Sequence, residues 1–405
     1  MRYSWWSGRL SFAADSHQHD PHFLLSSPAL KVALIVGISD MVGISLSKIL
    51  ASSDAPGGPW KVYGIARSPL PEGWPDESPI HLLKCNMLDP AEVMAKIEPL
   101  RDVTHLFWVP CMHTPIKQEK HTHAMATHMF ENIIGVLLTH APNLQHVCMQ
   151  TSDKHYTVSQ SYMRDVPFHE NMPRLHALNV YHSLEDILVD TAGKRPAGGI
   201  TWSVHRPSII VGFSPWNYTN LVGGLAVYAI ICKHEGTPFR CPGNGTTWER
   251  FVDLADANLV AEQEVWACIQ PSGKNQAFNI ANGDVISVKR LWNVVADKFG
   301  LEVPVPYNGK LAVSLEEMMK GKDEVWDEIV IKYGLHSTKL SEVGCWWYVD
   351  SILSASTPTI LNMNKSKELG FVAFRNTEAS ILHWIDEMKH RRQGCRCICV
   401  GYVQE

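Results

Sequence analysis

The chain has 405 residues, with 36 lysines and arginines against 41 aspartates and glutamates, which gives a formal net charge of -5. This balance argues against a protein that binds nucleic acid through a basic surface. The longest apolar runs are too short to cross a bilayer, and the first 25 residues lack the apolar stretch of a signal peptide. We therefore expect a cytoplasmic protein with no membrane or nucleic-acid partner.

The chain alternates between strand-like and helix-like segments after a loose N-terminal arm over 1–29. Such alternation is typical of a parallel sheet that helices cover on both faces. Strands are expected at 32–36, 61–66, 80–84, 105–109, 146–150 and 201–205, and helices at 42–51, 90–96, 118–140 and 174–191. Residues 30–210 therefore predict a Rossmann-type, doubly wound α/β domain that binds a dinucleotide.

The first strand, turn and helix carry an incomplete dinucleotide-binding fingerprint. Gly37 and Gly43 hold its first and third glycine positions, whereas Asp40 holds the middle one. A carboxylate there adds bulk and negative charge where a diphosphate would approach the backbone. The alternative is that Asp40 stabilises the helix N-terminus in a protein that no longer needs the phosphate.

Arg67 follows the second strand, where the ribose of a dinucleotide is recognised. An acidic residue at this point is typical of NAD binding, whereas an arginine accommodates the 2′-phosphate of NADP. A solvated loop arginine is the simpler alternative. If a cofactor binds, the sequence favours NADPH.

Two further segments hold candidate catalytic residues. Lys154 follows the fifth strand and can hold a substrate carbonyl as a cationic donor. Tyr181 and His182 lie on the next predicted helix, where successive side chains point about 100° apart. At most one of the pair therefore faces the substrate well, and the other is expected to be a half-buried structural residue.

Three histidines at 121, 123 and 128 raise the question of a metal site. Their spacing does not match the i, i+4 pair of a zinc-binding helix, and no acidic partner is near. We expect no metal there.

Residues 211–390 predict a smaller, mostly helical substrate-binding lobe, with some strands returning to the sheet. Ser287 and Gly300 bound one helix, and Ser314 with Glu317 forms a capping box for another. The aromatic run at 346–348 either covers an apolar substrate or belongs to the core. The cysteines are expected to be reduced, and the cysteine-rich tail at 391–405 is best explained as non-globular.

The chain resembles the progesterone 5β-reductase/iridoid synthase group of plant short-chain reductases over about residues 1–390. Shared stretches include SWWSG, PGGPWKVYGIARS, DVTHLFWV, TWSVHRPSIIVGFSP, MMKGKDEVW and VGCWWYVD. The resemblance implies an extended short-chain reductase that uses NADPH to reduce the C=C bond of an enone or enal, with hydride added to the β-carbon. Its partner is a small-molecule carbonyl substrate, and a homodimer is one option for its assembly.

The resemblance also implies roles for particular residues. Lys154 corresponds to the catalytic lysine, and His182 stands where the group has its catalytic tyrosine, while Tyr181 corresponds to the preceding tyrosine. The implied cofactor-binding residues are Gly37, Ser39, Asp40, Met41, Gly43, Arg67, Ser68, Asn86, Met87, Gln150, Ile210 and Val211. Four positions depart from the group's pattern: Asp40 for glycine, Ser68 for arginine, Asn86 for an acidic residue and Pro110 for threonine.

These departures leave three hypotheses. The leading one is an altered reductase in which a cationic His182 replaces the phenol as the enolate donor and NADPH binds more weakly. The second is a non-redox isomerase or cyclase that uses Lys154 and His182. The third is a catalytically silent binding protein on the same scaffold.

Overall fold

The computed structural model describes residues 30–67, 79–110, 119–157, 165–194, 199–215, 217, 219–243, 245–304, 314–353, 355 and 358–390. The predicted N-terminal arm at 1–29 and the tail at 391–405 lie outside these residues, as does Ser68. Within the described part, no helix has the length and apolar character that a bilayer-spanning segment needs.

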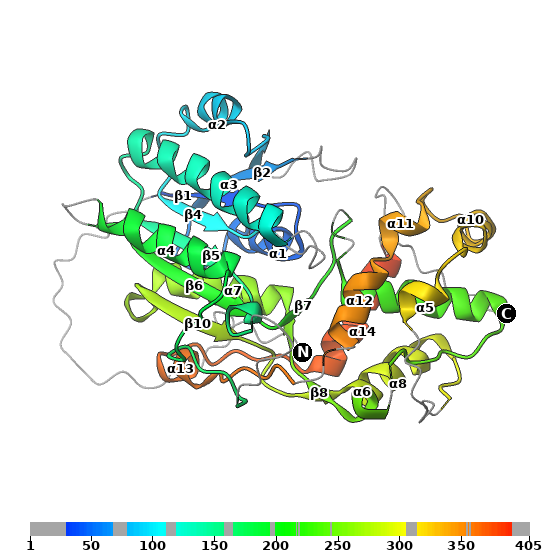
Figure 1. Ribbon diagram of the computed structural model, residues 1–405. Coiled ribbons are helices and arrows are strands. Elements are labelled where there is room, and N and C mark those ends of the chain that lie inside the picture. The colour runs from blue at the N-terminus through cyan, green and yellow to red at the C-terminus, as the bar shows by residue number, and fades with distance from the viewer. Residues whose placement is uncertain are drawn as a thin grey trace.

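A seven-stranded parallel sheet forms the centre of the larger body, in the order β10-β6-β5-β4-β1-β2-β3 (Figure 1). The strands are β1 (Lys31–Val36), β2 (Trp60–Ala66), β3 (Ile80–Lys84), β4 (His105–Trp108), β5 (His146–Gln150), β6 (Thr201–Pro207) and β10 (Gln276–Ile280). Strand β1 has β2 on one side and β4 on the other. The direction in which the chain adds strands to the sheet therefore changes at β1. Ligands of such sheets bind outside the carboxyl ends of the strands at this switch point. The predicted Rossmann-type fold is confirmed.

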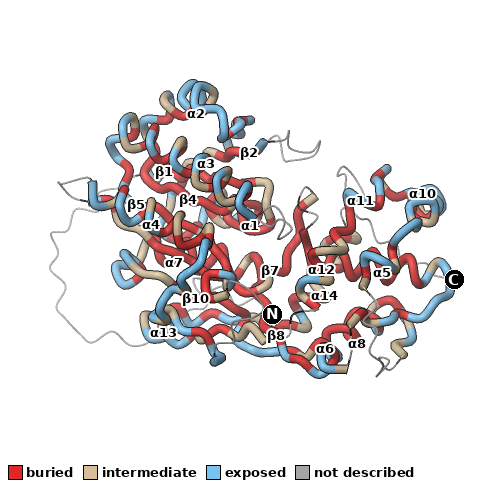
Figure 2. Tube along the Cα trace, viewed as in Figure 1, coloured by how far each residue is buried: buried red, intermediate tan, exposed pale blue. Residues whose placement is uncertain are grey.

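Two layers of helices cover the sheet. Helices α1 (Met41–Leu50) and α7 (Ala257–Ile269) share one hydrophobic core with alternate side chains of β1. Helices α2 (Pro90–Ile97), α3 (Glu119–His140) and α4 (Val180–Gly193) share a second core with the other β1 side chains. Successive strand residues point to opposite faces, which explains why the β1 sequence is apolar throughout. Figure 2 shows these central strands buried along their length.

The second half of the chain forms a mostly helical lobe beside the carboxyl edge of the sheet (Figure 1). Its helices are α5 (Leu221–Glu235), α6 (Gly245–Glu249), α8 (Val288–Phe299), α9 (Leu315–Met318), α10 (Asp323–Lys332), α11 (Leu340–Val343), α12 (Trp346–Leu353) and α14 (Thr377–His390). Strand β7 (Ile209–Val211) pairs with β9 (Leu254–Asp256), and β8 (Phe251–Val252) with β11 (Ile286–Ser287). Strand β10 and helix α13 (Asn364–Glu368) return to the sheet.

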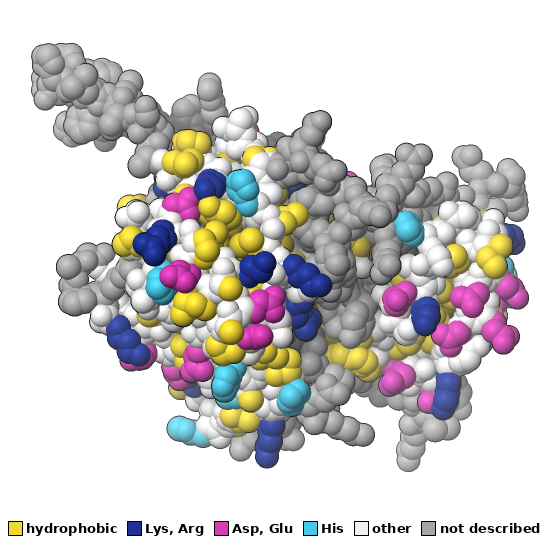
Figure 3. All heavy atoms as spheres, turned by 90° about the horizontal axis from the view of Figure 1, so that it is seen from above, with side chains coloured by type: hydrophobic (Ala, Val, Ile, Leu, Met, Phe, Trp, Pro, Cys, Tyr) yellow, Lys and Arg dark blue, Asp and Glu magenta, His cyan; other side chains and the backbone are white. Residues whose placement is uncertain are grey.

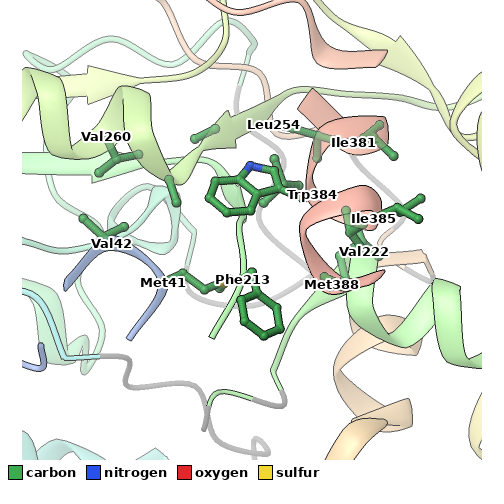
Figure 4. Close-up of a cluster of buried hydrophobic side chains, with 14 of the residues drawn as sticks. Met41, Val42, Phe213, Val222, Leu254, Val260, Ile381, Trp384, Ile385 and Met388 are labelled. Atoms are coloured by element: carbon green, nitrogen blue, oxygen red, sulfur yellow. The ribbon is translucent and has the colours of Figure 1, made fainter. Parts of the chain in front are cut away.

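The lobe and the sheet body share one continuous core. Figure 4 shows Met41 of α1, Phe213 and Leu254 meeting Trp384 and Ile385 of α14. The Trp384 indole Nε1 donates to the Asp256 carboxylate over 2.9 Å, so the polar atom of this buried ring is satisfied. The glycine turn at Gly37–Gly43 and the helical lobe are thereby held in a fixed relation.

Helix boundaries are mostly as the sequence predicts. Ser287 caps α8, and Gly300 ends it in the left-handed conformation, as expected. At α9, Ser314 Oγ accepts from the Glu317 amide, as the predicted capping box requires. A second acceptor completes the cap: the Asp350 carboxylate of α12 accepts from the Leu315 and Glu316 amides.

The prediction of a helix over 174–191 is wrong at its start. Helix α4 begins at Val180, and Asn179 caps it by accepting from the Tyr181 amide. Residues 174–178 are largely exposed. Helical packing therefore begins only where one face of the segment can be buried.

Candidate active site

The predicted site residues that the structure describes lie at or just beyond the carboxyl ends of parallel strands. Gly37, Ser39, Asp40, Met41 and Gly43 follow β1; Arg67 follows β2; Asn86 and Met87 follow β3; Gln150 ends β5; Ile210 and Val211 lie in β7; and Lys154 follows β5 in the short 3-10 helix η2 (Asp153–His155). Tyr181 and His182 are in the first turn of α4. The sheet therefore gathers residues from distant parts of the sequence along one edge.

The glycine turn is built so closely that side chains at two positions would collide with backbone. A Cβ at Gly37, whose φ is +90°, would lie 2.7 Å from Pro110 Cα, and a Cβ at Gly43 would lie 2.1 Å from the Gly37 carbonyl oxygen. Both glycines are therefore required for the close approach of β1, β4 and α1. This geometry brings the N-terminus of α1 to the switch point, where it can face a diphosphate.

Asp40 is the N-cap residue of α1, yet its carboxylate makes no capping hydrogen bond to the helix. It accepts instead from Asn217 Nδ2 of the loop before α5, over 3.3 Å. The predicted stabilisation of α1 by this carboxylate therefore does not take the form of a side-chain cap. Next to it, Met41 is 5 % exposed and packs in the core rather than at the surface.

Two predicted cofactor-binding residues at the ribose end of the site are exposed. Arg67 is exposed just beyond β2, where its guanidinium can reach a phosphate, and Asn86 is also exposed. Asn86 Oδ1 accepts from the Leu88 amide over 3.2 Å and shapes the turn after β3. Met87 is buried, and its carbonyl accepts from Asn132 Nδ2 of α3. Arg67 is therefore the described residue whose charge suits a 2′-phosphate.

Gln150, at the end of β5, has an unsatisfied acceptor. Its Oε1 is buried and has no hydrogen-bond partner among the described residues. A buried amide oxygen without a donor is costly, and a bound ligand with an N–H group would satisfy it. The close glycine turn, the N-terminus of α1 and this acceptor together fit a nicotinamide dinucleotide.

Lys154 is exposed, but its backbone is fixed. Ser152 caps η2 by accepting from the Lys154 amide over 3.3 Å, and Asn179 Nδ2 donates to the Lys154 carbonyl over 2.8 Å. The same Asn179 caps α4. One side chain thus joins the segment that carries Lys154 to the helix that carries Tyr181 and His182.

His182 is 8 % exposed and its Nε2 lies 2.9 Å from the carbonyl oxygen of His155. A carbonyl can only accept, so Nε2 carries the proton and donates it to this bond. Burial lowers the pKa of His182 below its ordinary value. This shift favours the neutral ring at neutral pH, with its lone pair on Nδ1, while the role of a cationic His182 as enolate donor stays a prediction.

A buried ion-pair network lies behind these residues. Glu185 of α4 accepts from Arg206 of β6 through Nε and Nη2, both over 3.0 Å, and Glu185 Oε1 lies 3.0 Å from His155 Nδ1. Burial alone would raise the pKa of Glu185, but the neighbouring His155 ring and the Arg206 charge lower it to about 2. Burial lowers the pKa of His155 to about 4. Arg206 Nη1 also donates to the Tyr156 hydroxyl over 3.1 Å, so the network fixes both residues that follow Lys154.

The histidines and aromatic residues singled out in the sequence lie on α3 and α12. His121 and His128 are exposed on α3, and His123 Nε2 lies 2.9 Å from Ser183 Oγ of α4. Among the described residues, no group of three or more histidines, cysteines or carboxylates is arranged to hold a metal. Tyr348 is buried, while Trp346 and Trp347 are half-buried on α12.

Four residues of this arrangement were missed by the sequence reasoning. The capping role of Asn179 could have been found, because asparagine before an apolar-periodic segment is a start signal. Arg206, a charge near the end of strand β6, could have indicated a buried partner. No local signal in the sequence identifies Glu185 as the partner of Arg206. The same holds for the contact between Asn217 and Asp40, which are 177 residues apart.

Comparison with known proteins decides the family. Residues 37–352 match the PRISE-like Rossmann-fold domain. The chain belongs to the PRISE-like Rossmann-fold family. This membership confirms the resemblance found in the sequence.

Curated PRISE-like relatives match nearly the whole chain. The 3-oxo-Delta(4,5)-steroid 5-beta-reductase of Arabidopsis thaliana is 44% identical over 95% of this chain and 98% of its own length. The (S)-8-oxocitronellyl enol synthase of Catharanthus roseus is 43% identical over 96% of this chain and 98% of its own length. The similarity therefore covers nearly the full length of both relatives.

Solved structures support the fold at lower identity. WbmH of Bordetella bronchiseptica, in complex with NAD+, aligns with a TM-score of 0.60 at 15% identity over 89% of this chain and 99% of that chain. The epimerase Mth375 of Methanothermobacter thermautotrophicus aligns with a TM-score of 0.61 at 14% identity, over 88% of this chain and 92% of that chain. These similarities concern the fold alone.

Proposed function

We propose that this PRISE-like protein catalyses the NADPH-dependent 1,4-reduction of an enone or enal. The observation that carries the proposal is the placement of Lys154: it is exposed beyond β5 and its backbone is tied to the first turn of α4. The relatives support it, since one is a 3-oxo-Delta(4,5)-steroid 5-beta-reductase and another an (S)-8-oxocitronellyl enol synthase.

The chain's residues would bind and orient the cofactor. The N-terminus of α1 faces the diphosphate, Arg67 pairs with the 2′-phosphate, and Gln150 Oε1 accepts from the carboxamide. When bound, NADPH supplies the hydride that goes to the β-carbon of the substrate. Asp40 and the serine at position 68 weaken the phosphate contacts that the group's pattern provides, so we expect weaker NADPH binding than in the relatives and no better NADH binding.

Lys154 would hold the carbonyl oxygen of the substrate. Hydride addition moves negative charge onto that oxygen, and a cation positioned there stabilises the resulting enolate more than it stabilises the substrate. His182 is neutral, so at neutral pH it adds no second positive charge. The reaction would therefore depend chiefly on Lys154, and we expect slow turnover.

One observation favours a second function. The proton on His182 Nε2 is donated to the His155 carbonyl, and Nδ1 carries the lone pair. A neutral imidazole of this kind is a base, which suits proton abstraction next to a carbonyl that Lys154 polarises. An isomerase or cyclase without hydride transfer is therefore the alternative function.

Reaction with deuterium-labelled NADPH separates these functions. A panel of a steroid enone, a monoterpene dialdehyde and a small enone is incubated with the purified protein, and products are identified by mass spectrometry. The reductase puts deuterium on the β-carbon and consumes one NADPH for each product molecule. Product formed without NADPH would support the isomerase or cyclase. Saturable binding of carbonyl compounds without any product would contradict both and leave the silent binding protein.

A further inference from the structure

The loop before α5 is fastened to the glycine turn by two side-chain hydrogen bonds. Ser214 Oγ donates to the Ser39 carbonyl over 2.6 Å, and Asn217 Nδ2 donates to Asp40 Oδ1 over 3.3 Å. We call the described residues of Gly212–Asn220 the docking loop. Their partners in the glycine turn lie where the cofactor diphosphate is expected.

Internal hydrogen bonds hold the docking loop in shape. The Asn217 amide donates to Ser214 Oγ over 3.2 Å, and Asn217 Oδ1 accepts from the Thr219 amide over 3.0 Å. Asn220 Nδ2 donates back to the Gly212 carbonyl over 2.9 Å. Asn217 is only 8 % exposed. With its oxygen occupied inside the loop, the Asn217 side chain presents its amide donor to Asp40.

Close packing keeps the docking loop against α1. A Cβ at Gly212 would lie 3.0 Å from the Met41 Cβ and 2.8 Å from the Ala257 Cβ. Phe213 and Met41 belong to the same core and lie side by side in Figure 4. The loop therefore cannot move away from the glycine turn without breaking this packing.

The bond to Asn217 sets the direction of the Asp40 carboxylate. An aspartate at the N-cap position ordinarily accepts from the amides of the first helical turn, and these are the amides that bind a phosphate. Asp40 has the extended backbone of an N-cap, with φ of -79° and ψ of 165°, but makes no such bond. A carboxylate that capped α1 would compete with the diphosphate for the same donors.

We propose that Asn217 is a positioning residue for cofactor binding: it holds the Asp40 carboxylate on the docking loop and so leaves the N-terminus of α1 to the diphosphate. This inference rests on the proposed function, because it concerns the affinity for NADPH. It explains how a site with aspartate at the middle fingerprint position can still accept a dinucleotide. The positioning role depends on the Asn217 bond to Asp40, whereas its bonds to Ser214 and Thr219 lie within the docking loop, so replacing Asp40 separates this role from loop stability.

A double-mutant cycle on NADPH binding tests the proposal. The dissociation constant is measured from tryptophan fluorescence, without substrate, for the wild type, Asn217→Ala, Asp40→Gly and the double variant. Removing the Asn217 donor removes one bond that directs the carboxylate away from the α1 amides, so Asn217→Ala should weaken NADPH binding about tenfold. In the Asp40→Gly background the same substitution should change the dissociation constant less than about twofold.

Ser214→Ala is the comparison variant, since Ser214 contacts the glycine turn through the Ser39 carbonyl rather than through Asp40. Because Ser214 Oγ also accepts from the Asn217 amide, the effect of this variant should depend on Asp40, but less than the effect of Asn217→Ala does. Thermal unfolding without cofactor shows whether each variant folds.

Three results would decide against the proposal. An equal loss for Asn217→Ala in both backgrounds would assign Asn217 to loop stability alone. No loss in the presence of Asp40 would show that the bond does not matter. If none of the four proteins bound NADPH, the proposed function would fail together with the inference, whereas the first two results overturn the inference alone.

Discussion

Asn179 donates from its side-chain Nδ2 to the backbone carbonyl of Lys154 over 2.8 Å. The oxygen of the same side chain accepts from the Tyr181 amide over 2.9 Å and caps α4. One side-chain amide thus joins the candidate catalytic lysine to α4, the helix that carries His182. Mutation can remove the donor of this amide alone or its donor and acceptor together.

Asn179→Asp should lower kcat while leaving the stability of α4 almost unchanged. Aspartate keeps the capping oxygen but cannot donate to the Lys154 carbonyl, and one neutral hydrogen bond contributes about 1 kcal/mol, or about fivefold. Asn179→Ala should lose the cap as well, with a further ~1 kcal/mol of unfolding free energy. Steady-state kinetics and thermal unfolding measure the two effects. An equal kcat for Asn179→Asp and wild type would remove Asn179 from the positioning of Lys154.

Lys154→Met should reduce enone reduction by ~100-fold or more, because the cation that stabilises the enolate oxygen is lost. The melting temperature should stay near that of the wild type, since the Lys154 side chain is exposed. Lys96→Met, at an exposed position of α2, is the control and should retain activity. Full activity in Lys154→Met would be incompatible with the proposed mechanism.

Lowering the pH should increase the reductase activity of the wild type. The pKa of His182 lies below its ordinary value of 6.5, so the ring gains its proton only as the pH falls through that lowered pKa. The cationic ring is a second donor for the enolate, and kcat/KM should rise from about pH 7.5 to about pH 5.5.

His182→Tyr should raise activity at neutral pH and remove this rise, since a phenol does not titrate in that range. An isomerase that uses neutral His182 as its base would show the opposite pH dependence. The pH profile of the two proteins on one substrate therefore separates the functions as well as the residue's role.

The sequence predicted the parts of the structure that depend on neighbouring residues. The apolar runs gave the six strands from β1 to β6, and Ser287 and Gly300 gave the ends of α8. The start of α4 was wrong because exposed residues before Asn179 continue an apolar period that has nothing to pack against.

The side-chain partners of the site could not be predicted in the same way. Glu185 and Arg206 are 21 residues apart, and Ser39 and Ser214 are 175 apart. Such contacts arise from the packing of whole elements, and no local pattern encodes them. The lowered pKa of His182 likewise depends on its burial in the folded protein. The family resemblance indicated the candidate site residues, while the structure supplied their hydrogen-bond partners.

Arg67→Ala should weaken NADPH binding about ten- to a hundredfold, since a charged contact with the 2′-phosphate is worth about 1.5–3 kcal/mol. NADH lacks this phosphate, so its affinity should change little. Titration of both cofactors against wild type and variant measures the difference. Equal losses for NADPH and NADH would mean that Arg67 does not recognise the 2′-phosphate.

Glu264 of α7 is fully buried, and its two carboxyl oxygens have no hydrogen-bond partner among the described residues. Burial raises its pKa well above the ordinary value of 4.5, so it stays protonated in the folded protein at pH values where the unfolded chain is ionised. At pH values above the unfolded-state pKa of about 4.3 and below the raised pKa of the folded protein, this group therefore costs about 1.4 kcal/mol of unfolding free energy for each pH unit.

Glu264→Met should therefore stabilise the protein, with a gain that grows as the pH rises through this window and shrinks towards the unfolded-state pKa. Urea unfolding of wild type and variant at three pH values in the window measures the slope. Glu131→Gln, at an exposed position of α3, is the matched control and should show no such trend. A gain that stayed constant with pH would mean that Glu264 is ionised in the folded protein, and the cost of burying it would then have to be offset by a partner close to α7.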